Sequence, residues 1–367
     1  MRATLIAPRK YVQGRGVIRE VGTYVKAIAA RPLILWDATV KELVGEAVYA
    51  GLAEAGLDAV DVTFAGDSTH AEAARVAGLA ADADVVIGIG GGKALDTAKA
   101  AAHQVGAKIV TVPTIASNDS PTSSYTVWYD EEGTCQGFES WGRNPDLVLV
   151  DTQVIANGPV AAFVAGMGDA LGTWVEADAC FKARAGNLAG GKSTLAAMAI
   201  ARLAYDILLE HGLEARRAVE HNVVTPAVEK VVEANVLLSG IGFESGGVAT
   251  AHMIANCLPS FPECHHLMHG HEVGFGVISQ LCLDDDFDTE EMLDVVDFEI
   301  AVGLPVTFED LGLAGVQRER LETIADICGG PGSLCENHPF EVTAADVLDA
   351  MIAADALGRE RKALLGA

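Results

Sequence analysis

The sequence of 367 residues lacks the features that would place it in a membrane or in a disulfide framework. No stretch reaches the roughly 18 to 20 uninterrupted apolar residues of a membrane span. The first residues, MRATLIAPRK, lack the apolar segment of a signal peptide. The seven cysteines never form a CxxC pair, which argues against both a disulfide framework and a zinc ribbon. We therefore expect reduced thiols, a cytoplasmic location and no membrane partner.

Basic residues are also scarce, since 25 Lys and Arg stand against 51 Asp and Glu, a formal net charge of −26. Such a charge repels phosphate backbones, so we expect no nucleic-acid partner. The simplest interpretation of the charge is solubility. Half of the residues are hydrophobic, 50%, which at this length is enough apolar material for two domains.

Two kinds of periodicity divide the chain. Up to about residue 153, alanine-rich helical stretches separate short apolar runs, which are PLILW (32–36), AVDVTF (59–64), DVVIGIG (84–90), KIVTVPT (108–114) and LVLVD (147–151). Continuous apolar runs of this kind are typical of parallel strands buried on both faces. Beyond about residue 160, apolar residues recur at spacings of three and four, which indicates helices, as in 193–215, 225–243 and 344–365.

The predicted architecture is therefore a doubly wound parallel α/β nucleotide-binding domain, residues 1–160, followed by an all-α domain, residues 161–367. Ligands of open parallel sheets bind beyond the carboxyl ends of the strands, and large clefts often lie between domains. We expect the active site in the cleft between the two domains.

A glycine-rich turn follows the apolar run at 84–90, with Gly90, Gly91, Gly92 and Lys93 ahead of a helical stretch. Glycines let backbone N–H groups approach a diphosphate closely, and a helix N-terminus favours its negative charge. The string is not GxGxxG, because Lys93 stands where the third glycine would be. A plain tight turn is the alternative interpretation.

Two further segments support a nucleotide site. Asp37 follows the run 32–36, where a carboxylate can accept hydrogen bonds from ribose hydroxyls and repel a 2′-phosphate, which favours NAD over NADP. A helix N-cap is the alternative role for Asp37. The hydroxyl-rich segment 113–130 is interpreted as a loop that contacts the cofactor, with Asp119 reaching a polyol hydroxyl; its composition alone would indicate a surface turn.

Histidines indicate a metal site in the second half. Five of the ten lie between His252 and His271, downstream of GMGDALGTWVEA with its carboxylate Asp169. Carboxylate oxygen and imidazole nitrogen suit zinc or iron(II), and three protein ligands leave a position open for substrate. By spacing alone, His265 and His266 are alternative ligands, and Cys264 is a weaker one.

Residues 186–193, GNLAGGKS, match the P-loop pattern GxxxxGK[ST] letter for letter. A P-loop follows a buried strand, whereas the preceding VEADACFKARA is helical in pattern. We interpret the segment as a helix–helix loop in which Ser193 or Thr194 caps the next helix.

Several motifs in order carry a family resemblance: GGGKALDTAK, PTIASNDSPTS, NPDLVLVDT, GMGDALGTWVEA, ESGGVATAHMIAN and HHLMHGHEV. Over essentially its whole length the chain resembles the iron-containing alcohol dehydrogenase superfamily, and within it the glycerol dehydrogenase branch. The resemblance implies NAD-dependent oxidation of glycerol to dihydroxyacetone, with related vicinal diols as further substrates. It also implies a homo-oligomer, with an octamer as the assembly that the family favours.

The resemblance implies a role for individual residues. The metal ligands fall on Asp169, His252 and His269. Thr173 stands where iron-using relatives have a histidine, which resembles the branch that uses Zn²⁺. Asp119 matches the substrate-contacting aspartate. The positions that match cofactor contacts are Asp37, Gly91, Gly92, Lys93, Thr114, Ser117, Ser123, Tyr125, Val127 and Tyr129.

Two positions depart from the family pattern. Tyr125 replaces the usual leucine, which puts nicotinamide packing and substrate preference in doubt, and His271-Glu272 replaces Glu-Lys. His271 is a candidate relay for the released proton. Two other functions remain open: a metal- and nucleotide-dependent lyase or cyclase of the dehydroquinate synthase type, and a metal-binding or nucleotide-sensing protein without catalysis.

Overall fold

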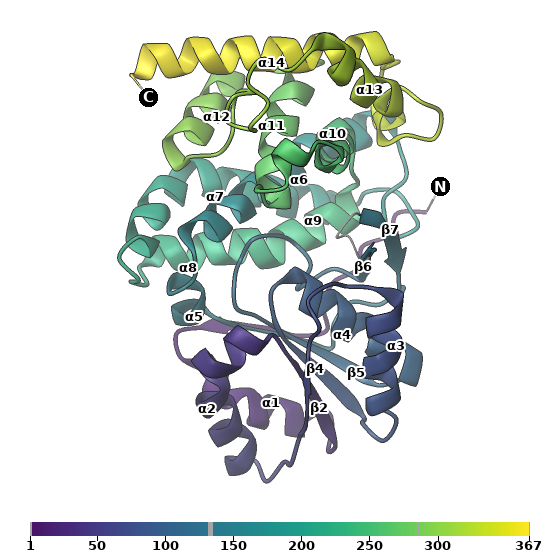
Figure 1. Cartoon of the computed structure of the whole chain (residues 1–367), viewed down its shortest axis with the longest axis vertical. Coiled ribbons are helices and arrows are strands. Elements are labelled where there is room, and N and C mark those ends of the chain that lie inside the picture. Colours follow the sequence, from purple (N-terminus) through teal and green to yellow (C-terminus); the bar gives the residue numbers. More distant parts are fainter. Residues whose placement is uncertain (1, 131–134, 285, 367) are drawn as a thin grey trace.

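The computed structural model describes residues 2–130, 135–284 and 286–366. Its N-terminal region contains a six-stranded sheet in the order β1-β8-β5-β4-β2-β3 (Figure 1). All of the pairings in this sheet are parallel. The strands are β1 (Tyr11–Gly14), β2 (Pro32–Trp36), β3 (Val60–Thr63), β4 (Val85–Gly90), β5 (Lys108–Pro113) and β8 (Leu147–Asp151). The five strands predicted from apolar runs are confirmed; β1 is an additional edge strand.

Helices cover both faces of this sheet, so the predicted doubly wound α/β fold is confirmed. On one face, α1 (Val21–Lys26) and α2 (Ala38–Glu54) pack against Ile34, Trp36 and Ile87. On the other face lie α3 (His70–Leu79) and α4 (Gly92–Val105). They pack against the side chains that alternate along the same strands with those of the first face, such as Leu33 of β2 and Val86 of β4. The inner strands β2, β4, β5 and β8 are buried almost throughout and are mainly apolar, whereas the edge strands β1 and β3 are more exposed.

The chain reverses its direction of winding between β2 and β4. After β3 it returns past β2 and adds β4, β5 and β8 on the opposite side. Trp36 and Ile89 are neighbours across this pair, so Asp37 and the glycine turn follow adjacent carboxyl ends. Open α/β sheets bind ligands at such a switch point.

Beyond β8 the described chain is helical, apart from one isolated bridge between Ala3 and Lys192, which confirms the predicted all-α region. Its helices are α5 (Thr152–Ala156), α6 (Val160–Ala183), α7 (Leu195–Val219), α8 (Pro226–Glu233), a π-helical segment (Ala234–Leu238), α9 (Ser239–Gly246), α10 (Thr250–Cys257), α11 (His269–Leu281), α12 (Thr289–Val302), α13 (Arg318–Cys328) and α14 (Ala344–Leu365). Short 3₁₀ segments span Val17–Glu20, Leu258–Ser260, Pro262–Cys264 and Leu334–Asn337. One hydrophobic cluster joins Val148 and Val150 of β8 to α6, α7 and α8. The exact division at residue 160 stays a prediction.

The interpretation of residues 113–130 as one loop needs a correction. Residues Tyr125–Tyr129 form β6, which pairs antiparallel with β7 (Cys135–Ser140) in a separate two-stranded sheet. The pattern YTVWY alternates between partly and fully buried positions, as a half-buried strand does. The density of hydroxyl groups just before it concealed this alternation.

None of the helices formed by the described residues is both long enough and apolar enough to cross a membrane. All seven cysteines are free thiols, and only Cys135 is exposed.

A buried carboxyl group in α12 affects stability. Glu299 is fully buried, and no described residue gives either carboxyl oxygen a hydrogen bond. Burial raises the pKa of Glu299 well above its ordinary value of 4.5. The folded protein therefore keeps this proton at a pH where the unfolded chain has lost it, and folding loses free energy as the pH rises above about 4.5.

We expect Glu299→Gln to remove this loss. The gain in free energy of unfolding over the wild type should grow between pH 5 and pH 8, by up to about 1.4 kcal/mol per pH unit for one proton. Urea denaturation at both pH values measures it. Glu290→Gln, at an exposed position of the same helix, is the control. An equal effect of Glu299→Gln at both pH values would contradict the expectation.

Candidate metal and cofactor site

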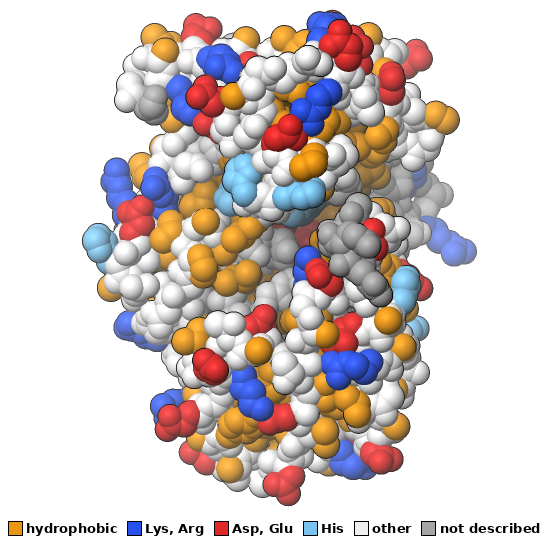
Figure 2. All heavy atoms as spheres, in the orientation of Figure 1, with side chains coloured by type: hydrophobic (Ala, Val, Ile, Leu, Met, Phe, Trp, Pro, Cys, Tyr) orange, Lys and Arg blue, Asp and Glu red, His pale blue; other side chains and the backbone are white. Residues whose placement is uncertain are grey.

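The three predicted ligands meet in the helical region. Asp169 lies on α6, His252 on α10 and His269 at the first position of α11. Their ligand atoms all lie within 4.8 Å of one another. Asp169 Oδ1 is 3.5 Å from His252 Nε2 and 3.8 Å from His269 Nε2. Asp169 Oδ1 is buried and has no hydrogen-bond partner among the described residues, so a metal ion fits this donor set. Figure 2 shows histidine side chains gathered on the surface of the helical region, above its junction with the α/β region.

Glycines bring the ligand-bearing helices together. A Cβ atom on Gly168 would lie 2.1 Å from the carbonyl oxygen of Gly270, and one on Gly270 would lie 1.8 Å from that of Ala165. Helices α6 and α11 therefore touch backbone to backbone, which any larger side chain would prevent. Asp169 and His269 are the sequence neighbours of these two glycines, so the close approach places their side chains together.

Glu176 is a site residue that the sequence analysis did not assign. It lies two turns after Asp169 on α6 and is fully buried. Its Oε1 accepts hydrogen bonds from the backbone N–H of Ala249 at 2.8 Å and of His252 at 2.9 Å, and its Oε2 contacts His252 Nδ1. This contact fixes the imidazole with Nε2 toward Asp169. Metal-binding histidines are commonly oriented by such a carboxylate. The spacing of seven between two acidic residues in GMGDALGTWVEA was the available signal.

The family resemblance places Thr173 where iron-using relatives have a histidine. Its hydroxyl lies 3.2 Å from Ser239 Oγ. A Cβ atom on Gly242 of α9 would lie 2.3 Å from Thr173 Cγ2, so the position is tightly packed. A larger side chain at position 173 would press against α9. Within the part of the chain that it describes, the structure brings together three candidate ligands.

The other candidate ligands lie elsewhere. His265 and His266 are exposed and bond to the carbonyl oxygens of Pro259 and Glu263. Cys264 is buried with its Sγ 3.5 Å from the Leu311 carbonyl oxygen. The structure does not bring these three side chains into the ligand cluster.

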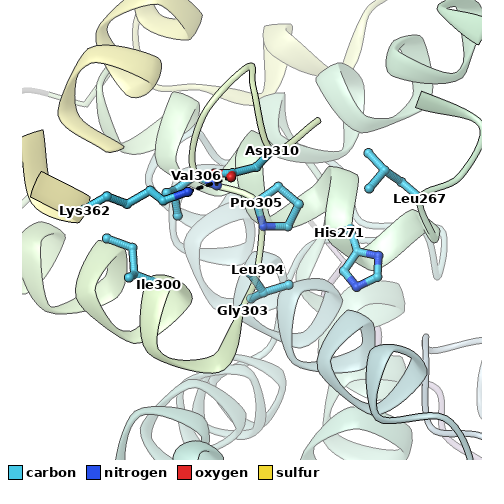
Figure 3. Close-up of a pocket in the computed structure, with 9 residues that line it drawn as sticks. All are labelled: Leu267, His271, Ile300, Gly303, Leu304, Pro305, Val306, Asp310 and Lys362. Atoms are coloured by element: carbon cyan, nitrogen blue, oxygen red, sulfur yellow. Dashed lines mark hydrogen bonds and ion pairs between the residues drawn. The ribbon is translucent and has the colours of Figure 1, made fainter. Parts of the chain in front are cut away.

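His271, the candidate proton relay, lies at a different cavity. Its Nδ1 accepts a hydrogen bond from the Met268 N–H at 3.2 Å. It lines a cavity of about 340 Å³ together with Leu304 and the ion pair of Lys362 and Asp310 (Figure 3). None of the three ligands lines this cavity. The geometry gives His271 no direct place in the cluster.

Asp119 joins the α/β region to the ligand cluster. Its backbone N–H donates to Asp169 Oδ2 at 3.1 Å. Burial, and then the charge of Asp169, raise the pKa of Asp119 well above its ordinary value. Burial opposes protonation of His252, but Glu176 and Asp169 raise the pKa of that imidazole well above its usual range. Burial lowers the pKa of His269. The site therefore concentrates negative charge that a divalent cation would balance.

The glycine turn has the features of a diphosphate site. Gly91 is the N-cap of α4 and makes no side-chain cap hydrogen bond, whereas Asp37 and Thr69 cap α2 and α3. The first N–H groups of α4 are therefore available to an anion. A Cβ atom on Gly92 would lie 2.8 Å from Asn118 Nδ2, so a larger residue there would displace the Asn118 side chain.

Asp37 lies beside this turn. It caps α2, with Oδ1 accepting from the N–H groups of Thr39 and Val40, so the alternative interpretation as an N-cap is correct. A Cβ atom on Gly90 would nevertheless lie 3.1 Å from Asp37 Cβ. Asp37 therefore lies directly beside the glycine turn, and its contact with a ribose stays a prediction.

The remaining predicted cofactor residues lie after β5 and in β6, apart from Lys93 at the start of α4. Thr114 donates its N–H to the Gly90 carbonyl at 3.1 Å. Lys93 is ion-paired with Asp67, and its Nζ lies 4.3 Å from the centre of the Tyr129 ring. Lys93 would have to leave Asp67 to bind a phosphate. Residues Ser117 and Ser123 are buried, and Tyr125 and Val127 are partly buried.

The segment 186–193 is not a P-loop. It follows helix α6 and not a strand, as expected. Thr194 caps α7 by accepting from the Ala197 N–H, and Ser193 Oγ donates to the Gly246 carbonyl at 2.6 Å.

Comparisons with known proteins agree with this architecture. Residues 8–152 match the family model described as iron-containing alcohol dehydrogenase. The chain is 43% identical to a glycolaldehyde reductase from Halobacterium salinarum, over 98% of this chain and 99% of the relative. It is also 43% identical to a glycerol dehydrogenase from Citrobacter freundii, with the same coverage. The crystal structure of glycerol dehydrogenase from Schizosaccharomyces pombe superimposes with a TM-score of 0.95 at 33% identity, covering 100% of this chain and 93% of that one.

The fold and these likenesses define a class of protein, an oxidoreductase with a nucleotide-binding sheet and a helical region. The chain belongs to the iron-containing alcohol dehydrogenase family.

We expect Glu176→Gln to weaken divalent metal binding about 10- to 100-fold, because the amide orients His252 less firmly than a carboxylate. Competition with a chromogenic zinc chelator measures the affinity without reference to turnover. Glu336→Gln, at an exposed position, is the control. Wild-type metal affinity in Glu176→Gln would show that this contact does not orient the ligand.

Proposed function

We propose that the protein oxidises glycerol to dihydroxyacetone, and related vicinal diols to hydroxyketones, with NAD and a divalent metal ion held by Asp169, His252 and His269. The observation that carries the proposal is the buried, unpartnered Asp169 Oδ1 facing two imidazole nitrogens, with Asp119 of the α/β region directly beside it. A divalent metal lowers the pKa of a hydroxyl group, and NAD accepts a hydride. We propose zinc as the metal. Catalytic zinc sites commonly have three protein ligands and leave one position for water or substrate, and here Thr173 is packed where a fourth ligand would lie.

The residues of the chain have distinct tasks in this proposal. The uncapped N-terminus of α4 and the Gly91–Gly92 turn hold the diphosphate, and Asp37 accepts from the ribose hydroxyls. Asp119 accepts a hydrogen bond from a second hydroxyl of the diol, so that the carbon to be oxidised points one way only. Glu176 holds His252 in place. Orientation of this kind supplies much of the rate acceleration of a two-substrate reaction.

A second candidate reaction is the reduction of glycolaldehyde to its diol, favoured by the relative from Halobacterium salinarum, which matches as well as the one from Citrobacter freundii. Both reactions interconvert a vicinal diol and a hydroxycarbonyl compound. They differ in whether the oxidised carbon is terminal, so one site with one geometry serves either.

We also propose a homo-oligomer, an octamer by family resemblance, that works in the cytoplasm. The exposed apolar side chains of Leu195 and Leu203, eight residues apart on α7, support an interface there. Residues at this spacing lie on one face of a helix.

The first test is the initial rate of NADH formation from glycerol by purified protein, before and after chelator treatment and zinc add-back. We expect Asp169→Ala and His252→Ala to lose turnover about 1000-fold or more, together with metal retention, because the metal supplies several kcal/mol of charge stabilisation. NAD binding, followed by fluorescence, should persist. His265→Ala, outside the cluster, should match the wild type.

Either outcome is informative. Wild-type turnover in metal-free Asp169→Ala would refute the metal-dependent reaction. Absence of hydride transfer with any diol or with glycolaldehyde and NADH, despite bound metal and NAD, would favour the lyase or sensor alternatives.

We expect Asp37→Ser to raise the KM for NAD about tenfold or more, a change of about 1.4 kcal/mol, and to reduce the preference over NADP. Serine keeps the N-cap of α2, so the loss reports the carboxylate and not the helix. Steady-state kinetics with both cofactors measure it, with Thr69→Ser, at the N-cap of α3, as the control. An unchanged KM for NAD would exclude the ribose contact.

A further inference from the structure

The segment 118–127 links the two halves of the candidate site. It contains Asp119, which contacts Asp169, and then Ser123, Tyr125 and Val127 on the way into β6. Between Asp119 and Tyr125 its backbone belongs to no helix or strand. Turn bonds within the segment pair the Thr122 and Ser123 N–H groups with the Asp119 carbonyl, and the carbonyl groups that follow need partners from outside the segment.

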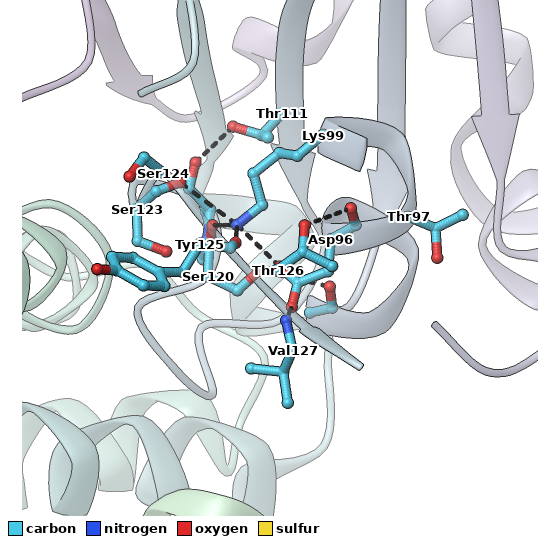
Figure 4. A network of polar contacts seen from close by, with 12 residues as sticks. Asp96, Thr97, Lys99, Thr111, Ser120, Ser123, Ser124, Tyr125, Thr126 and Val127 are labelled. Carbon is cyan, nitrogen blue, oxygen red and sulfur yellow. Dashed lines mark hydrogen bonds and ion pairs between the residues drawn. The ribbon is translucent and has the colours of Figure 1, made fainter. Parts of the chain in front are cut away.

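A buried lysine supplies these partners. Lys99 lies on α4 and is 4% exposed. Its Nζ lies 2.8 Å from Asp96 Oδ1, 3.0 Å from the Ser120 carbonyl oxygen and 3.3 Å from that of Ser123, and it also donates to the Tyr125 carbonyl (Figure 4). One ammonium group thus holds three carbonyl groups of the segment.

Asp96, the partner of Lys99, binds the same segment. Its Oδ1 accepts from Ser120 Oγ at 2.6 Å, and its Oδ2 accepts from the Val127 N–H at 2.9 Å. The Asp96 carbonyl accepts from Thr126 Oγ1 at 2.9 Å (Figure 4). A buried ion pair contributes little net stability, because desolvation offsets its attraction. Here both charges make their remaining bonds to one segment, so the pair serves to fix geometry.

The helical region holds the segment from the opposite side. Glu244 of α9 accepts from the Ser124 N–H at 2.9 Å and from the Ser124 hydroxyl. It also accepts from Asn144 Nδ2, which donates to the Thr122 carbonyl at 3.0 Å. The segment is therefore anchored to both regions, with the Lys99 network on the side of α4, the helix that begins at the glycine turn.

We propose that Lys99 is a positioning residue: with Asp96 it holds segment 118–127 so that Asp119 stays against the metal ligands while the cofactor lies at the start of the same helix. Lys99 contacts segment backbone and not the metal ligands, so it acts through Asp119. The effect on turnover of glycerol rests on the proposed function, whereas the effect on the mobility of residues 118–127 does not.

The test uses the paired variant Lys99→Met/Asp96→Asn, since removing one charge alone would leave the other buried and unpaired. We expect the free variant to show faster amide hydrogen exchange in peptides covering 118–127, with wild-type exchange in α6, α10 and α11 and wild-type zinc affinity. The value of kcat/KM for glycerol should fall about 10- to 100-fold. Lys182→Met/Asp178→Asn, which removes a surface pair of α6, is the matched control.

A double-mutant cycle separates positioning from general stability. If Lys99 acts through Asp119, adding the paired substitution to Asp119→Asn should lower kcat/KM for glycerol by less than about threefold. The proposal would be overturned if the fold losses in kcat/KM of the paired variant and of Asp119→Asn multiplied in the combined variant. Wild-type amide hydrogen exchange in residues 118–127 of the paired variant would overturn it as well. If the paired variant does not fold, Ser120→Ala removes one hydrogen bond to Asp96 and keeps both charges. We expect a smaller loss in kcat/KM from Ser120→Ala, and this loss must also disappear when Asp119→Asn is present. If the wild type itself transfers no hydride, the proposed function fails, and the exchange measurement still decides the role of Lys99.

Discussion

Helices α6 and α11 meet backbone to backbone at Gly168 and Gly270, and the candidate metal site depends on that contact. A similar contact joins α11 to α10, because a Cβ atom on Gly276 would lie 2.3 Å from the Ala251 carbonyl oxygen. Each of these contacts is adjacent in sequence to a ligand residue. Packed backbones move less than side chains do, so the three helices set the distances between ligand atoms before any metal binds.

The same close packing concentrates charge. The buried Asp169 and Glu176 lie close to the partly buried Asp119 and to two imidazoles. The raised pKa of Asp119 favours its neutral, protonated form. The raised pKa of His252 favours its protonated, charged form, because Glu176 and Asp169 outweigh the effect of burial. A divalent cation reverses this preference, because it needs ionised carboxylates and neutral imidazoles. Metal binding at this candidate site would therefore be coupled to proton release, and acid pH would oppose it.

Local patterns predicted those features that depend on neighbouring residues. The strands at 32–36 and 147–151 are recognisable because both faces are buried, and the glycine turn because it directly follows a strand. Glu176 was not assigned, because its partner His252 lies 76 residues away. The strand at 125–129 is less evident in the sequence, because hydroxyl-rich residues precede it and three of its five side chains are only partly buried. Pairings of distant residues require the fold itself.

Thr173 shows why a three-ligand site is a property of several elements and not of one substitution. Its hydroxyl bonds to Ser239, and Gly242 packs against its methyl group, so α9 fits a small side chain at this position. A larger side chain at this position would press against Gly242 of α9. Accommodating a histidine would therefore involve α6 and α9 together, because contacting positions do not act independently. The packing between these helices thus favours a small side chain beside the three candidate ligands.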